Sequence, residues 1–254
     1  MVAGSSPAGA TYARLSLLPR PWPIPGDGAS LHALIYRKEV PVPIPRRFHF
    51  IWVDGSPPLP GIFKGFVKRW EELHPDWEIR WWSTPDGPLQ NQDLYDHASA
   101  ICHPYEGQFR SDIWRYEILW KHGGVYVDVD FEPFKPLDSL LEDVECFTAW
   151  ELQDQYANNA IFGCTPGHPF LRDLIDELPE SVASHPEFGP WMISGPRHMT
   201  RTLAKHPEVT VFPQAMFYPI GCKHIDRLGH PEHYGDAWAV HWWNNAHRRR
   251  GKSL

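Results

Sequence analysis

The sequence predicts a single α/β domain with a mostly parallel central sheet flanked by helices. Short apolar runs bounded by turn residues alternate with amphipathic segments at helical spacing, and this alternation is typical of strand–helix–strand units. The chain has 254 residues, 42% hydrophobic and 22% charged, which is ordinary for one large globular domain. We find no internal repeat and no linker that would divide such a domain.

The first part of the chain predicts an irregular arm followed by the first elements of the sheet. Residues 1–43 are rich in Pro, Gly, Ala and Ser, and we expect them to form an N-terminal arm outside the domain. The domain is expected to begin at residue 44 and to run to residue 247. Its first expected elements are a strand at 48–53, a helix at 62–73, a strand at 77–82 and a helical segment at 93–100.

The stretch from Phe109 to Phe131 predicts an amphipathic helix, a glycine stop and an apolar strand. Asp112 and Arg115 lie three residues apart and project together from one face of this helix. Gly123 and Gly124 follow, and glycine ends a helix because it takes the left-handed conformation without steric cost. The residues expected to face the core recur at helical spacing: Phe109, Ile113, Tyr116 and Trp120.

The strand after the glycines ends in two aspartates. Alternate side chains of a strand point to opposite faces, so Asp128 and Asp130 share a face with Tyr126. Two carboxylates at this spacing lie about 6.5 Å apart along the backbone. The geometry suits a divalent cation, because oxygen ligands hold such ions. The alternative is an ordinary solvent-facing pair at the end of a strand.

The rest of the chain continues the α/β pattern and ends in a basic tail. The run from His247 to Lys252 is the only dense basic run, and residues 248–254 are expected to be a solvated tail. The later expected elements are strands at 146–150 and 160–163, helices at 169–178 and 192–204, and strands at 209–212 and 238–242.

Charge and cysteine content narrow the class of protein. A formal net charge of −7 argues against broad binding to nucleic acid. The 13 tryptophans offer flat surfaces that can stack on sugars or bases as well as fill a core. The four cysteines, Cys102, Cys146, Cys164 and Cys222, form no CxxC pair, so we expect reduced thiols in a cytoplasmic protein and no zinc cluster.

The chain shows no sequence feature of membrane insertion. No stretch approaches the roughly 20 apolar residues that cross a bilayer, and residues 1–20 do not resemble a signal peptide. We therefore expect no transmembrane segment. Peripheral contact with a membrane, through a partner or a surface helix, stays open.

Three segments together resemble a known family. Residues 44–52 (IPRRFHFIW), the helix segment with Asp112 and Arg115, and residues 123–130 (GGVYVDVD) occur in this order. They resemble the DXD-containing glycosyltransferases of the GT-A fold, a Rossmann-like α/β domain. The most similar group is the glycosyltransferase family 32 type, with yeast-type mannosyltransferases and bacterial capsular-sugar transferases. The large clostridial glucosylating toxins look like more distant relatives.

The resemblance implies a donor site that contains Mn²⁺ or Mg²⁺. Asp130 would bind the metal directly, and Asp128 would contact it through water or hold hydroxyls of the donor. Asp112 would accept hydrogen bonds from sugar hydroxyls, and Arg115 would contact the sugar or the phosphate. The catalytic set implied is Asp112, Asp128 and Asp130. The alternative for Asp112 and Arg115 is an ordinary ion pair on a helix, without a role in binding.

Other residues complete this implied site. Trp52 resembles the family aromatic that stacks on the nucleotide base, with core packing as its alternative. Tyr126 would form a wall of the site, with core packing as its alternative. Asn159 would reach the donor sugar, and a plain strand-entry turn is the alternative for the asparagines at 158 and 159. In the segment from Ala239 to Asn244, His241 is the expected third metal ligand. The turn at residues 194–196 (SGP) also resembles the family, but glycine and proline explain such a turn without a ligand.

The function expected from these residues is transfer of a hexose from a UDP- or GDP-sugar to an acceptor hydroxyl of a glycan, lipid or protein. The resemblance implies retention of the anomeric configuration, with front-face attack as the working hypothesis. Two alternatives stay open. An apolar strand ending in D-x-D also opens haloacid-dehalogenase-type phosphatases, and the abundant tryptophans alone would fit a sugar-binding module without catalysis.

Overall fold

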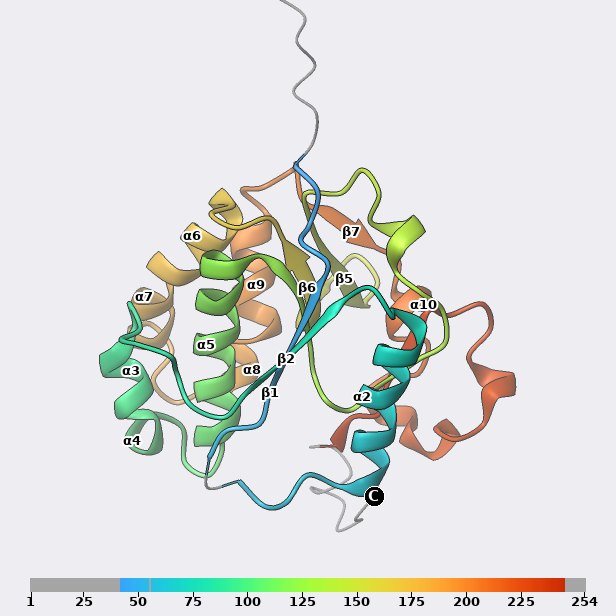
Figure 1. Ribbon diagram of the computed structural model, residues 1–254. Coiled ribbons are helices and arrows are strands. Elements are labelled where there is room, and N and C mark those ends of the chain that lie inside the picture. Colours follow the sequence, from blue (N-terminus) through green and yellow to red (C-terminus); the bar gives the residue numbers. More distant parts are fainter. Residues whose placement is uncertain (1–41, 55, 245–254) are drawn as a thin grey trace, which may run out of the picture. The chain divides into compact units, whose positions relative to one another are not determined.

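The computed structural model of the protein describes residues 42–54 and 56–244 (Figure 1). All of them belong to one compact unit that begins at residue 41. The predicted arm at 1–43, apart from residues 42 and 43, and the predicted basic tail at 248–254 lie outside the described residues. The boundaries of the predicted domain, 44 and 247, therefore stay predictions.

A six-stranded mixed sheet forms the centre of the molecule, in the order β2-β1-β3-β6-β5-β7. β1 pairs in parallel with β2 and β3, and β5 pairs in parallel with β7. β6 is antiparallel to both of its neighbours, β3 and β5. The strands are β1 (Arg47–Ile51), β2 (Glu78–Trp82), β3 (Gly124–Val127), β5 (Cys146–Leu152), β6 (Tyr156–Cys164) and β7 (Thr210–Phe212). The predicted α/β class with a mostly parallel sheet is confirmed.

Helices cover both faces of this sheet. Figure 1 shows α5, α6 and α9 on one side and α2 on the other. Most of the predicted segments are present, with ends shifted by a few residues. The helices are α2 (Gly61–Leu73), α3 (Gln92–Asp96), α4 (Ala98–Cys102), α5 (Glu106–His122), α6 (Pro169–Asp176), α7 (Leu178–Ala183), α8 (Pro190–Ile193), α9 (Pro196–Leu203) and α10 (Gln214–Phe217), with short 3₁₀ turns at Asp138–Leu140, Cys222–Arg227 and Pro231–His233.

The two faces of the sheet are buried in separate apolar clusters. On β3, Val125 and Val127 pack into the cluster that α2 covers, and Tyr126 between them packs into the cluster that α5 covers. This alternation is the strand periodicity that the sequence showed. Both faces of β3 are therefore buried in apolar side chains. The polar residue Asp128, directly after the strand, lies where the sheet borders a pocket.

Gly123 and Gly124 end α5 as predicted. Their φ angles are +60° and +101°, which side chains with a Cβ rarely adopt. A Cβ on Gly124 would also lie 2.4 Å from Cγ of Arg47, and one on Gly123 would lie 2.6 Å from Cδ of Pro166. Glycine is required here for both conformation and space, and the tight turn brings α5 directly into β3.

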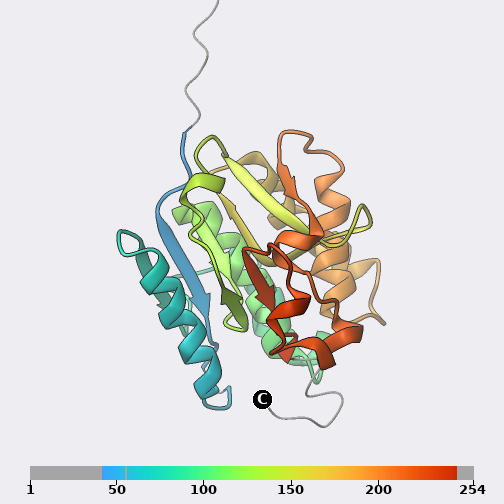
Figure 2. The same cartoon turned by 90° about the vertical axis from the view of Figure 1, so that its right-hand side faces the viewer.

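The two aspartates do not lie on a strand face, which corrects the expected geometry. β3 ends at Val127, and residues 128–130 form a turn that leads into β4 (Phe131–Pro133). The turn forms because pairing with β6 stops at this point and β4 pairs instead with β8 (Ala239–His241) in a separate two-stranded sheet. In Figure 2, β8, in the red C-terminal part of the chain, lies beside β4.

Two predicted helices are interrupted in the structure. The helix expected at 192–204 is wrong as one element, because Ser194 and Gly195 separate α8 from α9. Pro196 has no backbone N–H and begins α9, and Gly195 has a non-helical backbone. The segment expected at 93–100 is likewise divided into α3 and α4.

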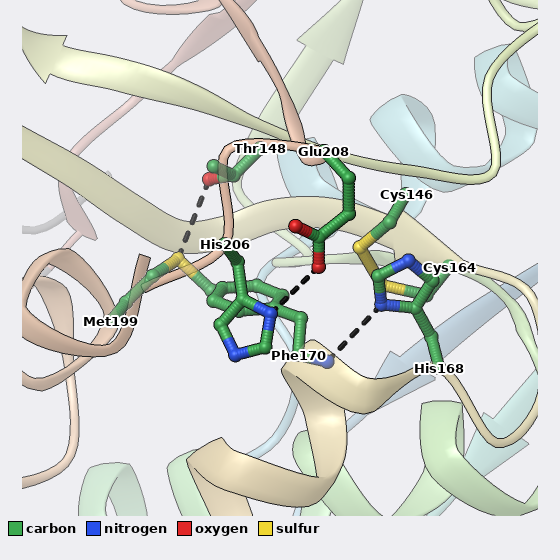
Figure 3. Close-up of a disulfide and its surroundings, with 8 residues drawn as sticks. All are labelled: Cys146, Thr148, Cys164, His168, Phe170, Met199, His206 and Glu208. Carbon is green, nitrogen blue, oxygen red and sulfur yellow. Dashed lines mark hydrogen bonds and ion pairs between the residues drawn. A yellow bond between two sulfur atoms is a disulfide. The ribbon is translucent and has the colours of Figure 1, made fainter. Parts of the chain in front are cut away.

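The expectation of four reduced thiols is wrong for two cysteines. Cys146 of β5 and Cys164 of β6 are direct neighbours in the antiparallel ladder and form a disulfide, with His168 beside them (Figure 3). The ligand atoms of these three residues lie within 4.8 Å of one another, but the sulfur atoms are bonded to each other and not available as thiolates. Cys102 and Cys222 take no part in this disulfide. The two cysteines are 18 residues apart in the sequence, so the spacing alone did not predict that they pair.

Among residues 42–54 and 56–244, no helix is long and apolar enough to cross a membrane.

Candidate active site

A pocket of about 650 Å³ opens at the carboxyl ends of β1 and β3. This is the edge where parallel strands of an open α/β sheet present ligand-binding residues. Every residue that the sequence placed in the site lines this one pocket: Trp52, Asp112, Arg115, Tyr126, Asp128, Asp130, Asn159 and His241. The fold thus brings together side chains separated by up to 189 positions, which is the span from Trp52 to His241.

Asp128, Asp130 and His241 form a compact cluster in the pocket. Nε2 of His241 lies 3.1 Å from Oδ1 of Asp130 and 4.0 Å from Oδ2 of Asp128. One ligand atom from each of the three lies within 4.8 Å of the other two. The side chain of Asp128 is 27% exposed, whereas those of Asp130 and His241 are 10% and 9% exposed. The cluster is open toward the pocket on the Asp128 side.

Asp130 is held by the chain that follows β8. Its Oδ2 accepts a hydrogen bond from the backbone N–H of Asn244 at 2.8 Å, and its carbonyl oxygen accepts one from the N–H of Trp242. Burial alone would raise the pKa of Asp130, but His241 and the Asn244 N–H lower it below its ordinary value. Asp130 is therefore an ionised carboxylate whose position depends on the C-terminal segment.

His241 stacks on Phe131, with ring centroids 4.7 Å apart and planes at 12°. Burial by itself would lower the pKa of His241, but the charge of Asp130 raises it above the ordinary value. Its Nδ1 atom is buried and has no hydrogen-bond partner among the described residues. The ring is thus fixed by packing and by its carboxylate neighbours.

The donor set of this cluster fits a divalent cation. Two carboxylates and an imidazole are suitable ligands for Mn²⁺, and carboxylates also suit Mg²⁺. The two carboxylates beside His241, of Asp128 and Asp130, stabilise a positive charge on its ring. They explain why a proton on His241 is favoured when no metal competes for Nε2.

Arg115 links the helix α5 to the aspartate turn. It is 3% exposed, and its guanidinium lies 3.2 Å from Asp112 and 3.3 Å from Asp128. Its Nη1 also donates to the carbonyl oxygen of Asn159 at 2.8 Å, and the group lies 4.3 Å from the centre of the Tyr126 ring. Burial by itself would lower the pKa of Arg115. The charge of Asp128, together with smaller effects of other neighbours, raises that pKa above the ordinary value.

Asp112 is almost fully buried behind Arg115. Its Oδ1 accepts a hydrogen bond from Nδ2 of Asn159 at 2.9 Å, and its Oδ2 accepts one from the hydroxyl of Ser194 at 2.7 Å. Burial raises the pKa of Asp112 to about 6, despite the charge of Arg115. Asp112 and Arg115 are therefore a buried ion pair and not the ordinary surface ion pair of a helix, which was the alternative interpretation.

Tyr126 positions Asp128. The phenol donates a hydrogen bond to Oδ1 of Asp128 at 2.6 Å, the same oxygen that Arg115 faces. Burial raises the pKa of Asp128 above its ordinary value, against the effect of Arg115. The two oxygens of Asp128 consequently differ: Oδ1 faces Tyr126 and Arg115, while Oδ2 faces His241.

Trp52 lies directly after β1 and forms part of the pocket wall. Its side chain is half-buried, and its indole N–H donates to the carbonyl oxygen of Pro57 at 2.9 Å. It also lines a neighbouring pocket that includes Trp81 and Trp82. Trp52 both packs against the apolar core and lines the pocket, so the structure contains both of its expected environments.

Several residues that line the pocket or contact its lining were not identified from the sequence. Ser194 was recognised only as part of a turn, yet its hydroxyl bonds to Asp112. Asn244 acts through its backbone N–H, which no side-chain pattern reveals. Glu151 and Trp191 also line the pocket, and they lie in segments without a recognisable motif. The Ser-Gly-Pro turn was the one available signal among these.

Comparison with known proteins bears on the class of the protein and on its fold. Residues 60–147 match the family model described as "Glycosyltransferase sugar-binding region containing DXD motif", and this region contains Asp112, Arg115 and both turn aspartates. The solved structure titled "PaToxG Glycosyltransferase" superimposes with a TM-score of 0.52 at 14% identity, over 65% of this chain and 70% of that chain. The chain carries the DXD-containing region of glycosyltransferases on a GT-A fold. The predicted fold is confirmed.

Curated relatives of this glycosyltransferase region include a mannosyltransferase, as expected. The chain is 31% identical over 142 residues to inositol phosphoceramide mannosyltransferase 3 of Schizosaccharomyces pombe, covering 54% of this chain and 37% of that protein. It is 28% identical over 169 residues to the human α-1,4-N-acetylglucosaminyltransferase, covering 59% of this chain and 47% of that protein. The chain thus spans less than half the length of these two relatives.

Proposed function

We propose that the protein is a metal-dependent glycosyltransferase that moves a hexose from a UDP- or GDP-sugar to an acceptor hydroxyl, with retention of configuration. The observation that carries the proposal is the cluster of Asp128, Asp130 and His241 beside Arg115 and Asp112 in one pocket. The matching family region and fold support the transferase class. The donor, the metal and the stereochemical outcome are our inferences from this site.

Asp130, His241 and Oδ2 of Asp128 are the groups that would hold Mn²⁺ or Mg²⁺. A divalent cation bound there would supply stabilisation of the negative charge that develops on the leaving diphosphate. Asp130 contributes its full charge because its pKa is lowered, and the Asn244 N–H keeps its second oxygen in place. His241 would hold the cation through Nε2 in its neutral form, without the proton that is otherwise favoured there.

Arg115 and Asp112 serve the sugar and phosphate side in this proposal. The guanidinium keeps a positive charge in the wall of the pocket, which suits a diphosphate or a sugar oxygen. Asp112 and Asn159 supply polar groups for sugar hydroxyls from the same wall. Trp52 would stack on the base at the other end, and Tyr126 would keep Asp128 oriented.

We infer retention by front-face attack. The bond from the anomeric carbon to the diphosphate oxygen breaks, and its electron pair leaves with the diphosphate. The acceptor hydroxyl oxygen forms the new bond on the same face, and its proton passes to an oxygen of the leaving diphosphate. Asp128 does not act as a covalent nucleophile in this scheme, since Tyr126 and Arg115 engage its Oδ1 atom.

The acceptor is proposed to be a glycan, a lipid or a protein. The names of two relatives include a ceramide-based lipid, inositol phosphoceramide in one and lactosylceramide in the other. The cytoplasmic location stays a prediction from the sequence, and the disulfide between Cys146 and Cys164 removes one of its arguments. The matching family region is described for glycosyltransferases, so it favours neither a phosphatase nor a sugar-binding module without catalysis.

A thermal-shift panel tests the proposal. UDP, GDP and their sugars are added with and without Mn²⁺, and one nucleotide is expected to raise Tm only in the presence of the metal. At 100 times Kd, binding stabilises the native state by about 2.7 kcal/mol, which raises Tm by roughly 5 to 10 °C in a domain of this size. Release of free sugar from the same donor should follow. Failure of every nucleotide to shift Tm would contradict the proposal.

A further inference from the structure

One wall of the pocket has no role in the donor site described above. It consists of Glu151 at the end of β5, Asn158 on β6 and Trp191 on α8. These residues line the same pocket as the Asp128, Asp130 and His241 cluster, so a molecule against this wall would lie beside a donor bound at the cluster. Their chemistry is a carboxylate, an amide and a large aromatic ring.

Glu151 is an inward-facing carboxyl group. Its Oε2 accepts a hydrogen bond from Nδ2 of Asn158 at 2.8 Å, and the indole of Trp191 lies within hydrogen-bonding reach of the same carboxyl. Burial raises the pKa of Glu151 above its ordinary value. Among the described residues, Glu151 forms no ion pair within 4.0 Å with a lysine or an arginine. A half-buried carboxyl with only neutral hydrogen-bond partners gains from further hydroxyl donors in the pocket.

Trp191 is held in a fixed position although it is exposed. Its side chain is 39% exposed, and Tyr156 packs against it edge to face at 5.1 Å and 72°. Arg197 holds Tyr156 in turn, lying over the ring at 5.2 Å and donating to the phenol oxygen at 3.2 Å. An exposed indole that is supported in this way costs little conformational entropy when a ligand packs on it.

We propose that Glu151, Asn158 and Trp191 form a binding site for the sugar ring of a carbohydrate acceptor. This inference rests on the proposed glycosyltransferase function and names its acceptor class. Trp191 would pack against the apolar C–H face of the ring, and Glu151 would accept hydrogen bonds from its hydroxyls. The Asn158 amide fixes the carboxyl and leaves it facing the pocket.

A carbohydrate suits this wall better than an acyl chain or a peptide side chain. An acyl chain has no donor for the Glu151 carboxyl and would bury it without compensation, which is unfavourable. A serine or threonine side chain offers one hydroxyl and no extended ring to cover Trp191. A pyranoside has several hydroxyls around an apolar face, and it satisfies both groups together.

Saturation-transfer NMR tests binding without any need for catalysis. Methyl α-mannoside, methyl β-galactoside, methyl β-glucoside and methyl β-lactoside are each mixed with the full chain at millimolar concentration. At least one glycoside should receive saturation from the wild type and lose at least three-quarters of it in Trp191→Ala. The matched control is Phe188→Ala, since Phe188 is 43% exposed and does not line the pocket. Its signal should equal that of the wild type.

A signal that Trp191→Ala leaves unchanged, or no signal from any glycoside, would overturn the acceptor site. Each variant is first checked by its Tm, because Trp191 packs on Tyr156. Glu151→Gln is the second variant. It keeps the size of the side chain and an oxygen acceptor for Asn158, so it removes the charge with less risk to the fold.

Partition of the donor sugar between acceptor and water separates the two proposals. With a donor found by the thermal-shift panel, the ratio of transfer to the glycoside over transfer to water should fall at least tenfold in Trp191→Ala and in Glu151→Gln. Phe188→Ala should keep the wild-type ratio. No donor turnover by the wild type together with a Trp191-dependent NMR signal would refute the transferase while supporting the sugar site. Normal turnover with an unchanged ratio would refute only the sugar site.

Discussion

Asp130 and His241 are 111 residues apart in the sequence, and Oδ1 of the first lies 3.1 Å from Nε2 of the second. The contact exists because β4, which follows Asp130, pairs with β8, which ends at His241. The backbone N–H of Asn244 then closes the other side of the carboxylate. The small second sheet thus brings His241 to Asp130, and the end of β3 in the central sheet supplies Asp128.

Asp130→Asn is expected to remove transferase activity and leave the fold intact. The amide can still accept the Asn244 N–H, but it cannot supply the anionic metal ligand. Loss of groups that merely support a ligand costs about 10- to 100-fold, so loss of the ligand itself should cost more than about 100-fold. The Mn²⁺-dependent rise in Tm should disappear, and Asp76→Asn, at an exposed position, should retain it. Full activity in Asp130→Asn would disprove the assignment.

Trp52→Ala is expected to raise the KM for the donor and to change kcat little. Stacking of the base on Trp52 would stabilise the ground state and the transition state equally. Loss of this contact therefore weakens donor binding without raising the barrier of the chemical step. A loss of about 1.4 kcal/mol corresponds to a tenfold higher KM. Trp81→Ala is the matched control, because Trp81 is 49% exposed and does not line the main pocket. An unchanged donor KM would return Trp52 to a packing role.

Arg115→Ala is expected to destabilise the protein by roughly 3 to 5 kcal/mol, because it leaves the buried carboxylate of Asp112 without a cation and removes the arginine that faces Oδ1 of Asp128. Denaturant unfolding monitored by tryptophan fluorescence measures this loss. The control, Arg110→Ala, removes a partly buried arginine on the same helix that contacts Tyr95. A loss below about 1 kcal/mol in Arg115→Ala would show that the network is not tightly coupled.

The raised pKa of Asp112 predicts a pH dependence of stability. A carboxyl whose folded pKa is about 6 rather than 3.8 binds its proton more tightly in the native state. Its contribution to stability is therefore present at low pH and is lost as the pH rises from 3.8 through 6. Relative to Asp112→Asn, which does not titrate, the wild type should lose roughly 1 kcal/mol between pH 5 and pH 7.5.

Chemical denaturation of both proteins at the two pH values checks this sign. The measured quantity is the difference in unfolding free energy between wild type and Asp112→Asn. A difference that stays constant, or that moves in favour of the wild type as the pH rises, would show that Asp112 does not carry a raised pKa.

The sequence predicted those parts of the fold whose causes are local. Helical spacing in α5, the two glycines after it and the alternation in β3 each depend on neighbouring residues, and the structure has them all. Element ends and breaks were predicted less well. The helix expected at 192–204 is divided by the turn from Ser194 to Pro196, although the sequence also showed glycine and proline at this turn.

The sequence by itself determined that a helix with Asp112 and Arg115 leads through a glycine turn into an aspartate pair, because these features follow from backbone conformation and side-chain spacing along one segment. Only the tertiary structure decided what meets them. Antiparallel β6 brings Asn159 to Arg115 and Cys164 to Cys146, and the turn before α9 brings Ser194 to Asp112. Contacts between distant segments depend on which strands pair, and spacing within a single segment carries no information about that choice.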